Sequence, residues 1–172
     1  MNRLIQACVW LSRIHRCRGF GVQSPTDYRY VCHVINQHSP YYAYEQLGTD
    51  EHWLQRKLGR LYFRIVNERQ PQTVLDGIGA EPYVKAGCNK ARITHSLDKI
   101  DMAFLPIKTN YQELFNCCDN DSVVVFQDIH RNMPLWHSIE YDARTAVTFD
   151  LYYCGIVLFD KKRSKHNYVI NF

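Results

Sequence analysis

The sequence of 172 residues contains no hydrophobic run that approaches the ~20 residues of a membrane-spanning helix. Near the start, the apolar stretch Leu4–Leu11 is interrupted by Gln6, and no small-x-small cleavage pattern follows it. We expect this stretch to form a helix, with Leu4, Cys8 and Leu11 on one face, and not a secretory signal. Internal repeats and low-complexity segments are also missing. These absences predict a cytoplasmic protein without a transmembrane segment.

The cysteines lack the spacing of a metal site or a disulfide framework. There are seven of them, none in a Cys-x-x-Cys pair, and Cys117 and Cys118 are adjacent. Buried, reduced thiols in a reducing compartment are therefore expected. Strong charge is lacking too, because a net charge of +4 is too small to indicate nucleic-acid binding on its own.

The first part of the sequence is typical of helices. Ser24 can cap a helix whose first turn begins at Pro25. The clearest helix has an apolar stripe that includes Leu58 and Leu61, both expected to be buried. Helices are expected over residues 4–11, 25–35, 41–47 and 51–67, so residues 1–70 are predicted to form a helical N-terminal cap.

After Pro71 the pattern changes to that of strands. Ser122–Phe126 has no polar face and is typical of a buried parallel strand. Thr73–Leu75 and Ile100–Leu105 are expected to be its neighbours in one parallel sheet. Short links join the last three β-rich runs and predict antiparallel strands. These runs are Ala146–Tyr153, Ile156–Phe159 and Tyr168–Phe172. Residues 71–172 are thus predicted to form a Rossmann-like α/β core, in a single domain with the cap.

The first candidate site follows the first predicted strand. Open α/β sheets bind ligands at the carboxyl ends of their parallel strands. In the run Asp76-Gly77-Ile78-Gly79, the glycines let a ligand approach the backbone and the acid can hold a ribose or an amine. Asp76, Gly77 and Gly79 are therefore the candidate cofactor-binding residues. The alternative is a plain turn that needs a positive φ.

The second candidate site follows Ser122–Phe126. Asp128 and His130 lie two positions apart after this strand. A carboxylate beside an imidazole can act as a base or hold a divalent ion. Asp128 and His130 are the candidate catalytic residues, and no metal site is predicted. The alternative is that Asp128 caps the next turn and His130 is merely exposed.

Two other features have both a functional and a structural interpretation. The tyrosines Tyr41, Tyr42 and Tyr44 are either a stacking wall for a ligand or part of the core. The basic run Lys161–His166 either contacts phosphate or forms a solvated hairpin loop.

Several motifs occur in order along nearly the whole chain. They are RGFGVQSP at 18–25, PYYAY at 40–44, LYFRIVN at 61–67, QP at 70–71, DIH at 128–130, TFDL at 148–151 and GIV at 155–157. Together they resemble a family of class I S-adenosylmethionine-dependent methyltransferases of Bacteroides-like bacteria. The resemblance implies a helical cap, a Rossmann-like methyltransferase core with an antiparallel strand near the end, and S-adenosylmethionine as cofactor.

The chain departs from the family pattern after the glycine turn. Only Ala80–Lys99 separate this turn from the strand at Ile100, whereas two βα units need about 60 residues on the βαβ scale. One or more βα units are therefore shortened or missing. The acid that would hold the cofactor ribose has no counterpart, because Asp98 is too close to Asp101 and the next strand.

These observations leave three functional hypotheses. The first is a methyltransferase relative with a degraded cofactor site and weak or no activity, in which Asp128 or His130 would orient or deprotonate an unidentified small-molecule or macromolecular acceptor. The second is a non-catalytic binding or interaction protein on a methyltransferase shell. The third is a nucleic-acid or membrane-surface module that uses the N-terminal helix and Lys161–His166.

Overall fold

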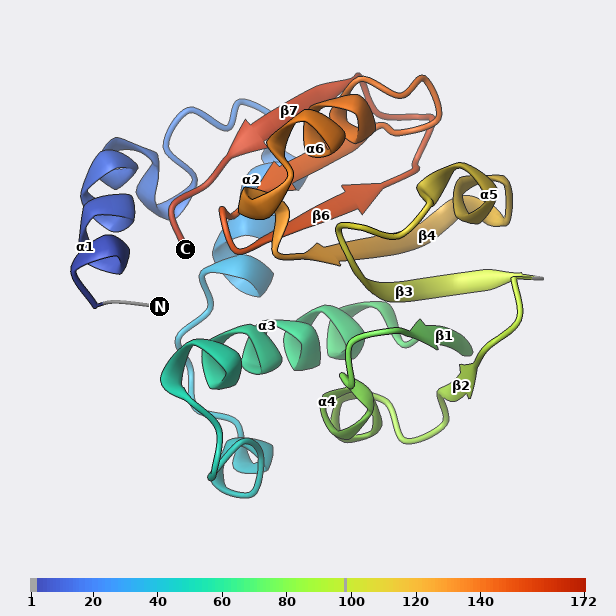
Figure 1. Ribbon diagram of the computed structural model, residues 1–172, viewed down its shortest axis with the longest axis horizontal. Coiled ribbons are helices and arrows are strands. Elements are labelled where there is room, and N and C mark those ends of the chain that lie inside the picture. Colours follow the sequence, from blue (N-terminus) through green and yellow to red (C-terminus); the bar gives the residue numbers. More distant parts are fainter. Residues whose placement is uncertain (1–2, 98) are drawn as a thin grey trace.

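The computed structural model describes residues 3–97 and 99–172, in which one seven-stranded sheet has the order β2-β1-β3-β4-β6-β5-β7 (Figure 1). The strands are β1 (Thr73–Asp76), β2 (Arg92–Thr94), β3 (Ile100–Pro106), β4 (Cys118–Gln127), β5 (Val147–Asp150), β6 (Cys154–Leu158) and β7 (His166–Val169). The α-helices are α1 (Arg3–Ser12), α2 (Pro25–Tyr30), α3 (Trp53–Arg69), α4 (Glu81–Gly87), α5 (Tyr111–Asn116) and α6 (Met133–Glu140). Short helical turns are η1 (Ile14–Gly19), η2 (Val31–Ile35), η3 (Tyr42–Glu45) and η4 (Ile129–Arg131).

The centre of the sheet is parallel. β3 lies between β1 and β4 and runs parallel to both, and β2 runs parallel to β1 at the edge. The prediction that the three runs at Thr73, Ile100 and Ser122 are neighbours in one parallel sheet is therefore confirmed. One helix, α4, and one strand, β2, lie between β1 and β3 along the chain.

Helices cover both faces of this sheet (Figure 1). Alternate residues of the central strands enter two separate cores, as expected for a strand buried on both sides. Phe104 and Val125 pack in the core beneath α3 and α4. Leu105 and Val124 pack in the core beneath α5 and α6. The protein is thus a mixed α/β fold consistent with a Rossmann-like arrangement.

The C-terminal strands follow the prediction in direction but not in pairing. β6 runs antiparallel to both β4 and β5, so the expected hairpin between β5 and β6 is confirmed. β7, expected over Tyr168–Phe172, begins at His166 and pairs in parallel with β5. Both edges of β6 are already occupied by β4 and β5, so the free edge of β5 is the one left for the last strand.

Helix α3 holds the helical segment against the sheet. Leu58 and Leu61 are buried, as the apolar stripe predicts. Arg64 is also buried, and its guanidinium donates hydrogen bonds to the carbonyl oxygens of Val34 and Ile35, with N–O distances of 2.6 and 2.9 Å. Arg64 thereby supplies hydrogen-bond donors to the carbonyl oxygens at the end of η2. No local sequence signal indicates this role.

The first helix, α1, turns a different face inward than its apolar pattern suggests. Cys8 and Leu11 are exposed, whereas Gln6 is buried and Arg13, just after the helix, is half-buried. Next to this helix, the guanidinium of Arg13 lies 2.9 Å from Oδ1 of the buried Asp150, so a long-range ion pair joins the end of α1 to β5. The side chain of Leu4, the third residue of the expected apolar face, lies outside the described residues.

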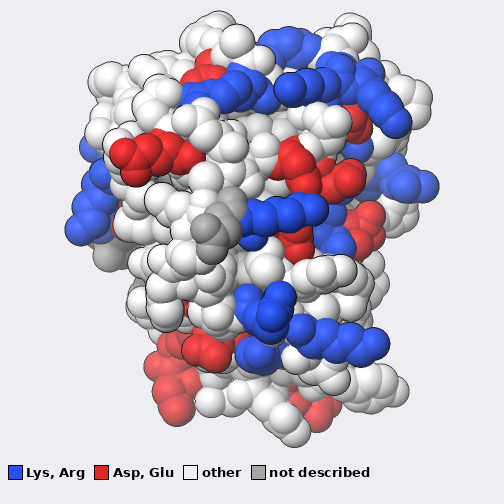
Figure 2. All heavy atoms as spheres, turned by 90° about the vertical axis from the view of Figure 1, so that its right-hand side faces the viewer, with Lys and Arg blue, Asp and Glu red and all other residues white. Residues whose placement is uncertain are grey.

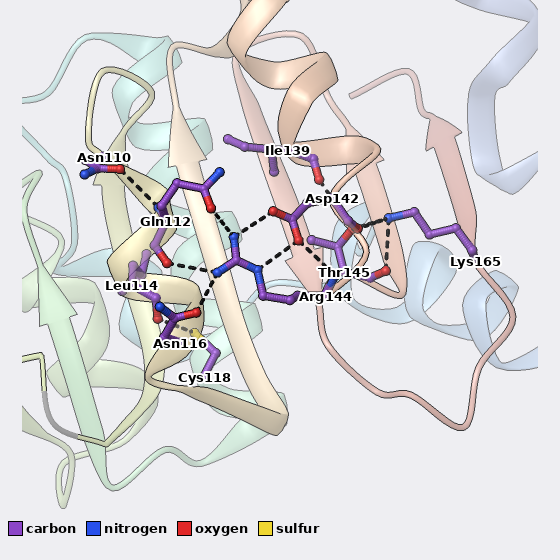
Figure 3. A network of polar contacts seen from close by, with 10 residues as sticks. All are labelled: Asn110, Gln112, Leu114, Asn116, Cys118, Ile139, Asp142, Arg144, Thr145 and Lys165. Carbon is purple, nitrogen blue, oxygen red and sulfur yellow. Dashed lines mark hydrogen bonds and ion pairs between the residues drawn. The ribbon is translucent and has the colours of Figure 1, made fainter.

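A polar network joins α5 to the link between α6 and β5 (Figure 3). The guanidinium of Arg144 donates to both carboxylate oxygens of Asp142 at 2.9 and 2.7 Å. It also donates to the backbone oxygen of Gln112 at 2.9 Å and to Oδ1 of Asn116 at 2.7 Å. Lys165 donates to the backbone oxygen of Thr145 and so extends the network toward β7.

The structure tests the expectation of buried, reduced cysteines. All seven cysteines are free, but only Cys88 and Cys154 are buried, while Cys8 is exposed. The prediction of uniformly buried thiols is therefore wrong, because the helical segment leaves several of them near the surface. Among the described residues, no helix has the length and apolarity needed to cross a membrane.

Candidate functional site

The carboxyl ends of β1, β3 and β4 lie side by side and form the carboxyl edge of the sheet, on the left in Figure 1. The turns that follow them are joined by backbone hydrogen bonds, since Gly77 donates to Phe104 and Ile107 donates to Gln127. This arrangement brings the Asp76 turn and the Asp128 turn to the same edge. Ligands of open α/β sheets bind at such an edge.

In the first turn, the side chain of Asp76 is used by the backbone. Its Oδ1 accepts the N–H of Ile78 at 3.0 Å, and its Oδ2 accepts the N–H of Glu81 at 2.7 Å. Asp76 therefore shapes the turn and caps the start of α4. These two contacts favour the interpretation of Asp76 as a structural residue of the turn.

The two glycines of this turn have different roles. A Cβ at Gly77 would lie 2.8 Å from Cδ2 of Leu105, so a side chain at this position would require the Leu105 side chain to move. Gly79 has a φ of +77°, and a Cβ there would meet no atom within 4 Å. The predicted need for a positive φ is thus met at Gly79, and the backbone there is open to a ligand.

In the second turn, the backbone is strained at two adjacent places. Asp128 has a φ of 63° and Tyr152 a φ of 69°, both in the left-handed region that residues with a side chain rarely adopt. The two turns are hydrogen-bonded, because Asp128 donates to the oxygen of Tyr153 and His130 donates to that of Tyr152. Strain of this kind clusters at functional sites.

Asp128 and His130 lie near each other, but no hydrogen bond or ion pair joins their side chains in the described part of the chain. The carboxylate of Asp128 lies 3.6 Å from Nε of Arg131, and its side chain is 38% exposed. The His130 ring instead stacks on Tyr152, with 5.0 Å between ring centroids and an angle of 16°. Asp128 occupies the N-cap position of η4, but its side chain makes no capping hydrogen bond, so the carboxylate does not cap this turn.

The environment keeps the imidazole of His130 neutral. Burial lowers the pKa of His130 below its usual value, and the nearby carboxylate of Asp128 opposes this only in part. Nδ1 of the ring is buried without a hydrogen-bond partner in the described part of the chain. A neutral imidazole with an unpaired nitrogen is the form that accepts a proton. Within residues 3–97 and 99–172, no three His, Cys, Asp or Glu side chains cluster as a metal site would require.

Among the described residues, the end of β2 offers no acid for a ribose. The strand ends at Thr94, whose hydroxyl accepts the N–H of Ser96 at 3.1 Å. The residues from 95 to 97 are His, Ser and Leu. Asp98 lies outside the described residues.

The opposite edge of the sheet, at the amino ends of β1, β3 and β4, carries charges of both signs (Figure 2). Lys and Arg side chains are interspersed there with Asp and Glu. Nζ of Lys99 lies 3.4 Å from the carboxylate of Asp119, and the carboxylate of Asp101 accepts the backbone N–H groups of Gln72 and Thr73. Lys99, Asp101 and Asp119 are thus occupied by partners within the protein.

The basic run Lys161–His166 is only partly free. Arg163 lies 2.8 Å from the buried Asp27 and 3.2 Å from Asp160, so it fixes the loop to α2. Lys161 and Lys162 are exposed. The central arginine of the run, Arg163, therefore has a structural role.

Sequence reasoning missed a cavity of about 890 Å³ beside α3. The sequence left open whether Tyr41, Tyr42 and Tyr44 form a stacking wall for a ligand or part of the core, and in the structure the three have different environments. Tyr41 and Tyr44 pack on Phe63, while Tyr42 is 95% exposed. The recurrence of arginine every four residues at 56, 60 and 64 is the signal that could have identified this cavity.

Comparison of the chain with protein-family models, with curated proteins and with solved structures finds no match. The site must therefore be interpreted from its own residues.

Proposed function

We propose that this chain is a shortened relative of S-adenosylmethionine-dependent methyltransferases that binds the cofactor weakly or not at all and works as a binding protein. The sheet supports the first part, because a single reversed strand, β6, lies between β4 and β5 near the end of the chain. This is the kind of antiparallel strand that the sequence resemblance implies. Fold alone does not fix activity, so the site has to carry the second part.

The observation that carries the proposal is the end of β2. In the proposed ancestry, an acid at this point holds the ribose hydroxyls of the cofactor, and here Thr94 is followed by His95, Ser96 and Leu97. Unpaired ribose hydroxyls forfeit charge-assisted hydrogen bonds of roughly 1.5–3 kcal/mol, or about ten- to a hundredfold in affinity. The described residues therefore fit S-adenosylmethionine poorly.

The shape of the glycine turn supports the same conclusion. Both carboxylate oxygens of Asp76 already accept backbone N–H groups, so the acid has less capacity for a ligand. The open backbone at Gly79 is the one feature of a cofactor site that persists. Asp128 and His130 stay the candidates for contact with an acceptor, since both lie at the same sheet edge.

Titration calorimetry with S-adenosylmethionine tests the proposal. We expect a dissociation constant weaker than about 100 μM for the unmodified chain. The variant Asp76→Ala is compared with Asp121→Ala, which removes an exposed carboxylate far from the turn, and circular dichroism checks that both are folded. Binding near about 1 μM that Asp76→Ala abolishes and Asp121→Ala preserves would overturn the proposal in favour of an active cofactor site.

A further inference from the structure

A cavity of about 890 Å³ lies between the first turns of α3 and the segment from Ile35 to Glu45. Its volume is in the range of about 300–1,000 Å³ that is usual for small-molecule sites. The residues that line it come from segments other than the Asp76 turn and the Asp128 turn. The cavity is therefore separate from the candidate site described above.

One wall of the cavity is basic. Arg56, Lys57, Arg60 and Arg64 line it, and the arginines recur every four residues on one face of α3. Like charges at this spacing destabilise a helix. In the described part of the chain, none of the four forms an ion pair with a carboxylate. The lining holds a single acid, the exposed Glu45.

Two atoms of this wall lack partners. Nε of Arg56 and Nε of Arg60 are buried without a hydrogen-bond partner among the described residues. Buried donors of this kind cost free energy unless something accepts their hydrogen bonds. The guanidinium groups of Arg56 and Arg60 therefore have donor capacity that the described protein groups do not use.

The pKa of Lys57 is affected by the same excess of positive charge. Its pKa is lowered first by burial and then by the guanidinium of Arg64. Its Nζ lies 4.4 Å from the ring centre of Phe172, so the ammonium is held at the cavity by a cation–π contact. An anion in the cavity would offset the repulsion between these cations.

The other wall is aromatic. Tyr44 packs edge-on against Phe63, with 5.4 Å between ring centroids, and the guanidinium of Arg60 lies 4.7 Å from the ring centre of Tyr44. These contacts fix the base of the wall. Tyr42, by contrast, is 95% exposed, so its ring is free to stack on a planar group. Trp53, at the start of α3, is 39% exposed, and its ring lies 6.2 Å from that of His52, so part of its surface is also open to such a group.

We propose that this cavity binds a small molecule in which a planar aromatic ring carries a phosphate group. The phosphate lies against Arg56, Lys57 and Arg60, because guanidinium groups match phosphate oxygens in charge and in planar hydrogen-bonding geometry. The ring lies against Tyr42 and Trp53. A nucleoside monophosphate has this chemistry. The inference is independent of whether the Asp76 turn binds S-adenosylmethionine.

Titration calorimetry with three probes tests the proposal on the unmodified chain. The probes are adenosine 5′-phosphate, adenosine and inorganic phosphate. We expect adenosine 5′-phosphate to bind at least about tenfold more tightly than either part alone, and its affinity to fall as salt is raised. Equal affinity for the nucleotide and for one of its parts would overturn the proposal, as would no detectable binding.

Variants locate the site. Arg60→Gln removes a cation of the cavity, and Arg29→Gln removes an exposed arginine on α2 as a matched control. We expect Arg60→Gln to weaken adenosine 5′-phosphate binding by about tenfold or more and Arg29→Gln to leave it unchanged. Tyr42→Ala gives an independent test if Arg60→Gln fails to fold, because the ring is 95% exposed and contributes little to the core.

Two results would contradict this assignment. The first is unchanged affinity in both Arg60→Gln and Tyr42→Ala. The second is a single-stranded oligonucleotide that binds at least about tenfold more tightly than adenosine 5′-phosphate, since that would make the cavity part of a nucleic-acid surface. A loss of stacking in Tyr42→Ala of about fivefold or more supports the small-molecule site.

Discussion

The side chain of Asp76 is bound to the backbone of Glu81, with 2.7 Å between Oδ2 of the carboxylate and the amide nitrogen. A second bond, from the N–H of Ile78 to Oδ1, completes the turn. We therefore expect Asp76→Ala to lower the free energy of unfolding by about 0.5–2 kcal/mol, the usual cost of losing a helix cap. Urea denaturation measures this loss. Asp76→Asn, which keeps one acceptor oxygen, should lose less, and an unchanged stability in Asp76→Ala would mean that the carboxylate is free for a ligand.

Leu58 tests the packing of α3 against the sheet. Its side chain is 5% exposed within the core beneath α3 and α4, so Leu58→Ala should cost about 2–5 kcal/mol in urea denaturation. Leu11→Ala is the matched control, because Leu11 is 59% exposed and its loss should change stability by less than about 0.5 kcal/mol. Equal costs for the two variants would contradict the buried position of Leu58.

The parallel core could be predicted because its signal is local. Val124 and Phe126 belong to a run without polar residues, and such a run has to be covered on both faces. The turn at Gly79 was predictable for a similar reason, since glycine after a strand indicates a positive φ. The presence of α3 followed from the period of its apolar stripe, although the helix spans Trp53–Arg69, two residues later at each end than the predicted 51–67.

The parts that the sequence did not predict depend on contacts between distant residues. Arg13 pairs with Asp150, 137 residues further on, and no local pattern indicates this contact beside α1. β7 pairs with β5 because β6 has no free edge, whereas a short link specifies only the direction of a strand. The stack of His130 on Tyr152 likewise joins two turns that lie apart in sequence, so the electrostatics of the candidate site could not be derived locally.

His130 gives a pH-dependent prediction. Burial lowers its pKa below the usual 6.5, so the unfolded chain binds a proton more readily than the folded chain does. The contribution of His130 to stability is therefore complete above about pH 6.5 and is lost as the pH falls through the lower folded value. NMR titration of the ring protons, assigned with His130→Gln, should give a midpoint below 6.5. A midpoint at or above this value would show that Asp128 outweighs burial.

Arg144 gives the last prediction, because its guanidinium joins α5 to the link before β5 (Figure 3). Its two bonds to Asp142 and its bond to Asn116 need a planar group with several donors. We expect Arg144→Ala to lower the free energy of unfolding by about 1.5–3 kcal/mol at pH 7, and Arg144→Lys to restore little of it. Arg131→Ala is the control, since Arg131 is 71% exposed and lies 3.6 Å from Asp128, and it should cost less than about 1 kcal/mol.

The same network predicts how the Arg144 effect changes with pH. The hydrogen bonds from Arg144 are the first cause that holds the pKa of Asp142 below its usual value of 3.8. A lowered carboxyl pKa adds stability above the unfolded value, and this stability is lost as the pH falls through the folded one. The difference between the unmodified chain and Arg144→Ala should therefore shrink between about pH 4 and pH 2. Urea denaturation across this range measures it, and a difference that stays constant down to about pH 2 would mean that Arg144 acts through its neutral partners Gln112 and Asn116 instead.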